Sequence, residues 1–149
     1  MTGKVVAVSI SKEKGERKTP QALVEFRENH GIVGDAHAGD WHRQVSLLAM
    51  ESIHKMQQLG LSVGAGDFAE NITTEGIDLV SLPIGTRLGL GEAILEVTQI
   101  GKECHARCAI YYQAGDCVMP KEGIFARVVR GGAAVPGETL ALLPHTDPE

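Results

Sequence analysis

The chain has no long apolar run. None of its segments approaches the roughly 20 consecutive apolar residues that a membrane-spanning helix needs. The amino terminus also lacks a secretory signal, because its short apolar stretch soon gives way to the charged residues Lys12, Glu13 and Lys14. Three cysteines, an odd number, do not make a disulfide framework and indicate free thiols in a reducing compartment. We therefore expect a soluble cytoplasmic protein with no membrane partner.

Positive charge is also scarce. The 14 Lys and Arg residues are outnumbered by 19 Asp and Glu residues, which leaves a net charge of −5. This balance argues against a nucleic-acid partner, although a basic loop could still hold a small anion. The 149 residues, 43% of them hydrophobic, suit one globular domain without internal repeats or low-complexity segments. We predict a single domain over residues 1–149 that binds a small molecule or a protein.

Short segments rich in β-favouring residues are the main structural signal. Four of them predict strands: Lys4–Ile10, Thr86–Leu90, Ala93–Gln99 and Thr139–Leu143. A glycine turn at 89–91 joins the middle two into a hairpin. Short strands separated by Gly and Pro turns are typical of barrels and sandwiches, so we expect a mostly β fold with a few helices.

Two helices are predicted. Apolar residues at positions 45, 47, 48, 53, 56 and 59 recur at about the helical period, with Ser46 as a suitable N-cap and Gly60 as a suitable stop. A second, shorter helix is predicted within 120–132, where two glycines would end it. Arg127 and Arg130 on this segment are either anion contacts or solvated charges.

Three polar segments carry candidate binding residues. Residues 11–18 include Lys12, Lys14 and Arg17, and form either a solvated turn or an arm that binds phosphate. Residues 31–43 contain three glycines and five polar side chains, namely Asp35, His37, Asp40, His42 and Arg43, which is more than a connecting loop needs. His37 and His42 match no strong metal-ligand spacing, so we expect this loop to shape a pocket by hydrogen bonding. In the third segment, Asp67, Glu70 and Asn71 could line a cleft.

Cys104 follows the predicted hairpin and is flanked by Lys102 and His105. The thiolate is the reactive form of cysteine, and neighbouring cations lower the pKa of a thiol from its usual value of about 8.5. Cys104 is therefore a candidate nucleophile. The alternative is that it is a small buried hydrophobe, as free cysteines often are.

Five motifs in order along the chain resemble the MOSC domain, the carboxy-terminal module of molybdenum cofactor sulfurases. They are Gly34–Gly39, Arg43–Leu48, Glu70–Leu79, Ile84–Leu88 and Leu95–Gln99, the last followed by a cysteine five residues after its glutamine. Each motif is weak alone, but five in register are specific. The type that the chain resembles is the stand-alone bacterial MOSC protein linked to molybdenum cofactor biosynthesis.

The resemblance implies a β-barrel-like fold of the MOSC or pyruvate kinase β-barrel type, and binding of the molybdenum cofactor (molybdopterin). By position it implies that Cys104 carries sulfur as a persulfide or ligates the metal, with Lys102 as activating cation and His105 beside it. The implied cofactor-binding residues are Asp35, His37, Arg43 and Asn71, with the basic loop residues Lys12, Lys14 and Arg17 for phosphate. Soft thiolates suit such a metal centre, and Lys or Arg suits phosphate.

The implied partners are the molybdenum cofactor or a molybdoenzyme, and a cysteine desulfurase as the sulfur donor. In full sulfurases the pyridoxal phosphate chemistry belongs to a separate domain, which this chain is too short to include. Whether the chain is itself an enzyme, with sulfur transfer as its reaction, is left open.

Two further thiols depart from the usual single-cysteine pattern. Cys108 and Cys117 follow Cys104, and a helical segment would place Cys104 and Cys108 on one face. One of them could resolve a persulfide, or both could be inert buried thiols. The second function class is a non-catalytic module in which these cysteines and His105 hold zinc, but their spacing is irregular for a zinc site.

Overall fold

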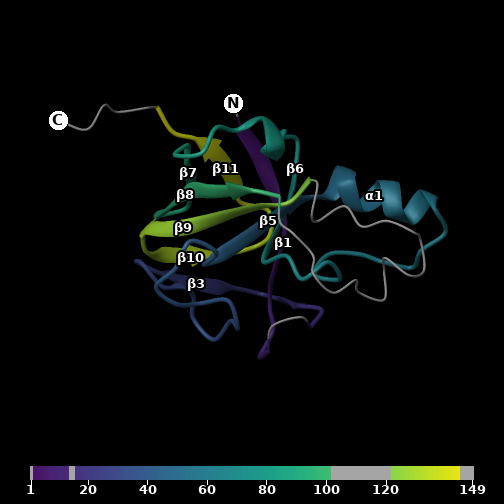
Figure 1. The fold of residues 1–149 in the computed structure, drawn as a ribbon, viewed down its shortest axis with the longest axis horizontal. Helices are drawn as coiled ribbons and strands as arrows, with labels where there is room; N and C mark the ends of the chain where they lie inside the picture. The colour runs from purple at the N-terminus through teal and green to yellow at the C-terminus, as the bar shows by residue number, and fades with distance from the viewer. Residues whose placement is uncertain (1, 14–15, 102–121, 145–149) are drawn as a thin grey trace.

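The computed structural model describes residues 2–13, 16–101 and 122–144 (Figure 1). In these ranges the elements follow in the order β1 Thr2–Ile10, β2 Thr19–Gln21, β3 Val24–Arg27, β4 Gly31–Ile32, β5 Val45–Ala49, α1 Met50–Gln58, β6 Ile72–Glu75, the 3-10 helix η1 Leu79–Ser81, β7 Arg87–Leu90, β8 Ala93–Ile100, β9 Ile124–Arg130, β10 Gly132–Ala134 and β11 Thr139–Leu142. The mostly β fold with few helices is therefore as predicted.

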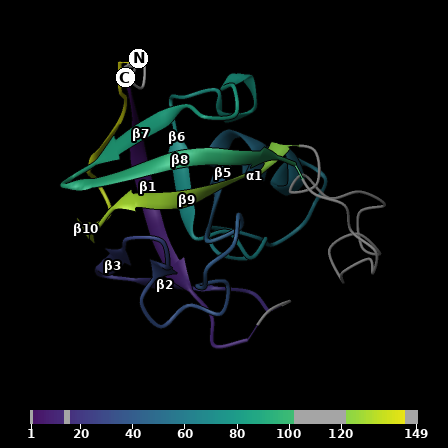
Figure 2. The same cartoon turned by 60° about the vertical axis from the view of Figure 1, so that its left-hand side comes forward.

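Seven strands close into a barrel in the order β11-β7-β8-β9-β5-β6-β1, because β1 also pairs with β11. β2 extends the sheet beyond β1, and β10, β3 and β4 form a second, three-stranded sheet. All barrel neighbours are antiparallel except β5 and β6, whose parallel pairing is reached through α1. Figure 2 shows β7, β8 and β9 crossing the barrel in front of β1.

The barrel interior holds the larger apolar cluster, which includes Val5, Leu47, Leu88 and Leu95. The burial of β8 alternates along its length, as expected for a strand with one face inward. A second cluster lies between α1 and the barrel wall and includes Leu48. In the part of the chain that the structure describes, no helix is long and apolar enough to cross a membrane.

The predicted helix that begins near Ser46 was wrong in its first part. Residues Val45–Ala49 are strand β5, and α1 begins only at Met50. Leu47 points into the barrel cluster and Leu48 into the cluster beneath α1, so both faces of β5 are buried. A strand buried on both faces is a continuous apolar run, which periodicity alone does not separate from a helix. The predicted stop was right, because Gly60 follows α1 at a φ of +92°.

The second predicted helix, within 120–132, was also wrong. Residues Ile124–Arg130 form β9, which pairs with β8 on one side and β5 on the other. Its β-favouring residues Ile124, Phe125 and Val128 are buried in the barrel wall. Arg127 is held by Glu96 on β8, with Nε 2.7 Å from Oε2, and Arg130 is exposed.

Candidate functional site

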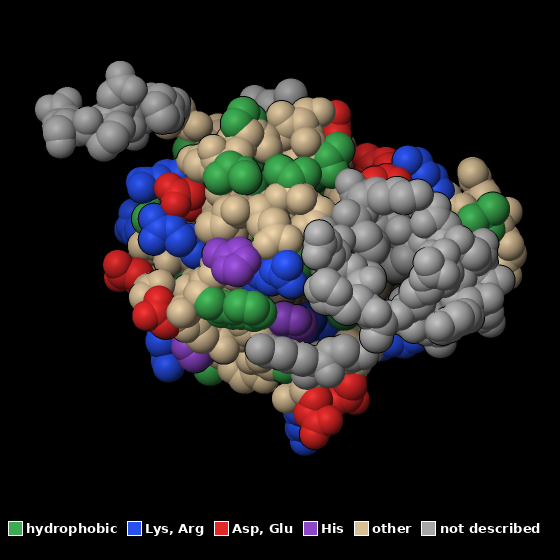
Figure 3. Space-filling view, in the orientation of Figure 1, with side chains coloured by type: hydrophobic (Ala, Val, Ile, Leu, Met, Phe, Trp, Pro, Cys, Tyr) green, Lys and Arg blue, Asp and Glu red, His purple; other side chains and the backbone are tan. Residues whose placement is uncertain are grey.

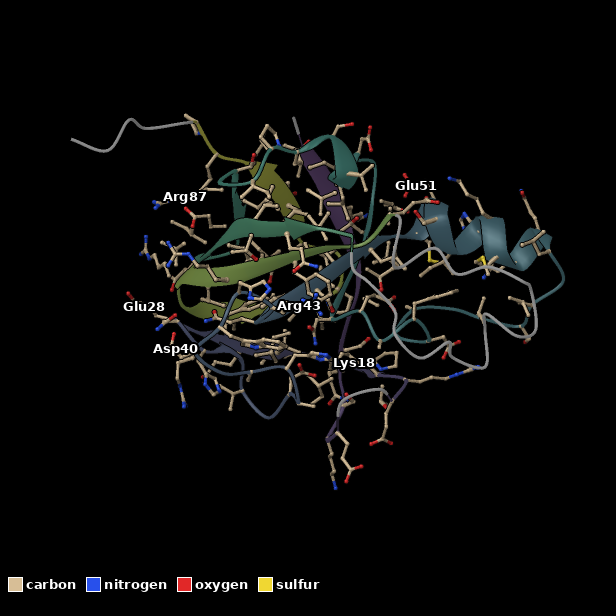
Figure 4. All side chains as sticks on the ribbon, viewed as in Figure 1. Lys18, Glu28, Asp40, Arg43, Glu51 and Arg87 are labelled. Atoms are coloured by element: carbon tan, nitrogen blue, oxygen red, sulfur yellow. The ribbon has the colours of Figure 1, made fainter. Side chains whose placement is uncertain are left out.

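One face of the molecule gathers side chains from three separate segments. Lys18 comes from the connection between β1 and β2, Asp35 to Arg43 come from the loop before β5, and Gln99 comes from the end of β8. Lys18 and Arg43 lie on this face in Figure 4, and Figure 3 shows histidine, Lys or Arg, and hydrophobic side chains meeting there.

Lys18 is the centre of a buried polar cluster. Its ammonium lies 2.8 Å from Oδ1 of Asp35, 2.9 Å from Oγ of Ser11 and 3.1 Å from Nδ1 of His37. An ammonium has three hydrogens and no acceptor, so all of its donors are used. Because an ammonium can only donate, Nδ1 of His37 accepts in this contact.

Asp35 is the counter-ion of Lys18 and the anchor of its own loop. Its carboxylate also accepts the backbone N–H of Ser11 and that of His37, each at 3.0 Å. Burial raises the pKa of Asp35, but the hydrogen bond and charge of Lys18 and the two backbone N–H groups lower it more, so the pKa lies below its usual value. Asp35 is therefore ionised at neutral pH.

Trp41 links this cluster to the rest of the site. Its ring is parallel to that of His37, with centroids 6.3 Å apart, and meets the ring of His42 edge-on at 5.7 Å. Its indole Nε1 donates to the carbonyl oxygen of His37 at 2.7 Å. The three rings form a continuous row from Lys18 toward Arg43.

Arg43 is half-buried beside Gln99. Its Nε donates to Oε1 of Gln99 at 3.0 Å, and its guanidinium lies 5.2 Å from the ring centroid of Phe125. Nε2 of His42 lies 3.0 Å from the same Gln99 oxygen, so His42 donates there as well. Among the residues described, no carboxylate pairs with Arg43.

Gln99 also connects Arg43 to Gly101, the residue that follows β8. Its Nε2 donates to the carbonyl oxygen of Gly101 at 2.7 Å. The backbone N–H of Gly101 in turn donates to the carbonyl oxygen of Gly123 at 2.6 Å, and Ile100 pairs with Ile124. The chain therefore leaves β8 and returns to β9 at one place, beside Arg43.

Asn71 lies behind this site with no exposed surface. Its Oδ1 accepts from the backbone N–H of Ser46 at 2.9 Å, and its Nδ2 donates to the carbonyl oxygen of Ser9 at 3.1 Å. Ser46 is thus bound to Asn71. The prediction that Ser46 is the N-cap of the helix was wrong, because the N-cap of α1 is Ala49. Asn71 supports the wall of the site by joining β1, β5 and β6.

Glu70 is likewise fully buried, so the expectation that it lines a cleft with Asn71 was wrong. Burial raises the pKa of Glu70, and hydrogen bonds from Gly66, Thr73 and Phe68 only partly offset this. Asp67 is half-buried and lies 3.6 Å from the guanidinium of Arg17.

The predicted phosphate arm is mostly at the surface. Lys12 and Arg17 are exposed, and Lys14 lies outside the described residues. Cys104, Lys102 and His105, which the sequence proposed as the reactive group, also lie outside them, as do Cys108 and Cys117. Within the described ranges, no group of three His, Cys, Asp or Glu side chains could hold a metal ion.

A cleft of about 440 Å³ lies elsewhere, between α1 and the residues around η1. Its described lining includes Glu51, Ser52, Lys55 and Glu122, and none of the predicted site residues. Ser52 and Lys55 both bond to Glu122, at 2.6 and 3.0 Å.

The model of one protein family, the MOSC domain, matches residues 34–142. The match covers more than half of the chain and includes the loop from Asp35 to Arg43. The chain belongs to the MOSC domain family. MOSC domains are linked to the molybdenum cofactor and its sulfur chemistry. None of the curated proteins compared with this MOSC domain matches it in sequence.

Solved structures share the fold of this MOSC domain. The YuaD protein of Bacillus subtilis superposes with a TM-score of 0.78 at 21% identity, over 94% of each chain. YiiM from Geobacillus stearothermophilus has a TM-score of 0.71 at 21% identity, over 95% of this chain and 75% of that one. YiiM from Escherichia coli has a TM-score of 0.69 at 18% identity, over 98% of this chain and 71% of that one.

Two residues at the centre of the candidate site were not predicted from the sequence. Lys18 belongs to the basic segment 11–18, which the sequence left as either a solvated turn or a phosphate-binding arm, yet its side chain has no exposed surface. The available signal was Asp35, because an aspartate in a glycine-rich pocket loop needs a cation or several donors when buried. Gln99 was placed at the end of a predicted strand and in the motif Leu95–Gln99, but nothing in the sequence placed it against Arg43.

Proposed function

We propose that this MOSC domain binds the molybdenum cofactor and carries sulfur on Cys104, beside the face that carries His37 and Arg43. One observation carries the proposal. The bond between Gly101 and Gly123 brings the chain from β8 and back to β9 next to Gln99 and Arg43. Cys104 follows Gly101 by three positions, and three residues span at most about 10 Å.

The donors on this face suit the molybdenum cofactor, a pterin dithiolene that carries a phosphate. Arg43 has a guanidinium without a described carboxylate partner, and an arginine fork matches phosphate oxygens. His37 lies on the same face, with its Nδ1 against the Lys18 ammonium. In this proposal Arg43 and His37 hold the cofactor, Asp35 and Asn71 hold the pocket from behind, and Lys12, Lys14 and Arg17 add positive charge at the rim.

When bound, the cofactor supplies a molybdenum centre that a thiolate can ligate. The sulfur transfer itself is carried out by a cysteine of this chain. The Cys104 thiolate attacks the outer sulfur of a persulfide on a cysteine desulfurase, the sulfur–sulfur bond of that persulfide breaks, and the donor leaves as a thiolate. Cys104 then carries the sulfur as its own persulfide, and no net oxidation occurs. Lys102 and His105 stabilise the thiolate, because nearby cations lower the pKa of a thiol.

The remaining expectations belong to the same proposal. The sulfur acceptor is the cofactor itself or a molybdoenzyme that holds it. Residues 1–149 act as a single MOSC domain, and free thiols favour a reducing compartment such as the cytoplasm.

Persulfide transfer tests the proposal. Purified protein is incubated with a cysteine desulfurase and L-cysteine, and the mass of each cysteine-containing peptide is measured. We expect a gain of one sulfur on Cys104, abolished by Cys104→Ser and retained in part by Cys108→Ser. Equal loss in both variants would refute Cys104 as the sole carrier. Stoichiometric zinc that is lost on Cys104→Ser would instead support the zinc-binding module.

A further inference from the structure

Glu70 is a buried carboxylate held by one tight turn. Its Oε2 accepts the backbone N–H of Gly66 at 2.8 Å and the hydroxyl of Thr73 at 2.7 Å, and its Oε1 accepts the backbone N–H of Phe68 at 3.2 Å. In the part of the chain that the structure describes, no cation bonds to it. Burying a carboxylate without a cation is unfavourable, and the three hydrogen bonds that Glu70 accepts offset part of that cost.

The turn that Glu70 holds lies directly against the backbone of Lys18. The carbonyl oxygen of Gly66 accepts the backbone N–H of Lys18 at 2.8 Å. A Cβ on Gly66 would lie only 2.2 Å from the carbonyl oxygen of Lys18, so the two backbones meet too closely for any other residue. The position of Lys18 is therefore set by the shape of this turn.

The turn keeps its shape at some cost in backbone strain. Ala69, next to Glu70, has a φ of +64°, a conformation that residues with a Cβ rarely adopt. Such strain persists only where surrounding bonds determine the conformation. Here the N–H of Ala69 donates to the carbonyl oxygen of Gly66 at 3.0 Å, and the carboxylate of Glu70 closes the turn from the other side.

We propose that Glu70 is a positioning residue for Lys18: its carboxylate fixes the turn at 64–69, and the turn places the Lys18 ammonium between Ser11, Asp35 and His37. This inference adds to the proposed function a residue that supports the site without touching a ligand. The inference depends on the proposed function only because Lys18 belongs to the candidate site.

A glutamine cannot take the place of Glu70. In the native protein, Oε2 of Glu70 faces the backbone N–H of Gly66, and Oε1 faces that of Phe68. An amide would have to point its NH₂ group at one of them, leaving that donor without a partner. Glu70→Gln is therefore expected to distort the turn, although its volume is almost unchanged.

The test measures the Lys18 ammonium directly. Brief treatment of the full-length protein with acetic anhydride, followed by peptide mass spectrometry, gives the acetylation rate of Lys18 relative to the exposed Lys12. We expect Lys18 to be protected in the wild type and to be acetylated at least about tenfold faster in Glu70→Gln. Thr73→Val, which removes one donor to the carboxylate, should give a smaller increase in the same direction.

Two controls separate positioning from general loss of stability. Ala69→Gly suits the positive φ and leaves the carboxylate bonds in place, so Lys18 should stay protected. Leu88→Val on β7 weakens the barrel core away from this turn and should also leave Lys18 protected. A folded Glu70→Gln with Lys18 as protected as in the wild type would overturn the inference. If Glu70→Gln does not fold, an unchanged rate in Thr73→Val would overturn it, and a faster rate would support it.

The result does not depend on sulfur chemistry. A protein that never takes up sulfur on Cys104, but shows the faster Lys18 acetylation in Glu70→Gln, would refute the proposed function and leave the positioning role of Glu70 standing.

Discussion

Nζ of Lys18 lies 2.8 Å from Oδ1 of Asp35, and neither side chain has any surface exposed to solvent. The same ammonium binds Ser11 and His37, while the carboxylate binds the backbone of both residues. The pair therefore joins the connection after β1 to the loop before β5. This network sets the path of the loop that carries Trp41 and Arg43.

Removing the Lys18 ammonium should lower the folding stability of the protein. Lys18→Met leaves the Asp35 charge buried without its counter-ion, and breaking one partner of a buried ion pair typically costs about 3–5 kcal/mol. Urea unfolding followed by circular dichroism measures the loss. Lys12→Met, at an exposed site of the same loop, should change stability by less than about 0.5 kcal/mol. Similar small effects of both substitutions would contradict the buried pair.

Asp35 should stabilise the fold down to acid pH. The pKa of Asp35 in the folded protein lies below its usual value of 3.8. Its stabilisation is therefore complete above that value and is lost only as pH falls through the lower folded pKa. Melting temperatures of the wild type and Asp35→Asn should differ by a constant amount at neutral and weakly acid pH. This difference should shrink below pH 3.8. A difference that shrinks already near neutral pH would contradict a depressed pKa.

Four of the seven barrel strands, β1, β7, β8 and β11, were predicted from their β-favouring residues, and β6 was not. Ala93–Gln99 and the hairpin between β7 and β8 follow the alternation expected for strands with one buried face. Lys4–Ile10 does not, since its successive residues Ala7, Val8 and Ser9 are all buried. β5 and β9 were misassigned because their apolar runs arise from long-range burial. β5 lies between the barrel interior and α1, and β9 lies between β5 and β8. Local periodicity carries no information on such neighbours.

Of the candidate site, only the loop from Asp35 to Arg43 could be predicted from the sequence. The mixture of glycines with Asp35, His37 and Arg43 marked the segment, and the structure brings those residues to one face. Lys18 and Gln99 come from positions 17 residues before Asp35 and 56 residues after Arg43. Their roles depend on burial and on the pairing of β8 with β9, which the spacing of residues does not encode. The roles of Cys104, Lys102 and His105 remain predictions.

The stability contributed by Glu70 should depend on pH in the direction opposite to that of Asp35. The pKa of Glu70 is raised above 4.5 in the folded protein, so the folded state holds a proton that the unfolded chain has already lost. Its contribution to stability therefore falls as pH rises from 4.5 through the folded pKa, and stays constant above it. Glu70→Gln cannot titrate, so the stability of the wild type relative to this variant should decline over that range. A relative stability that rises instead would show that the pKa is lowered.

Arg43 should govern the binding of anions at the candidate site. Trp41 is the single tryptophan of the chain and is stacked on His37, so its fluorescence reports on this face. Titration with pyrophosphate should change the Trp41 signal in the wild type. Arg43→Ala should weaken that binding about 10- to 100-fold, because a hydrogen bond to a charged group contributes about 1.5–3 kcal/mol.

The matched control for this prediction is Arg43→Lys, which keeps the charge. A lysine lacks the planar fork and does not reproduce its bidentate geometry, so Arg43→Lys should bind pyrophosphate with intermediate affinity. The folding stability of both variants should change little, since Arg43 is only half-buried and has no described carboxylate partner to leave unpaired. Unchanged pyrophosphate affinity in Arg43→Ala would place the anion elsewhere, with the exposed Lys12 and Arg17 as the next residues to substitute.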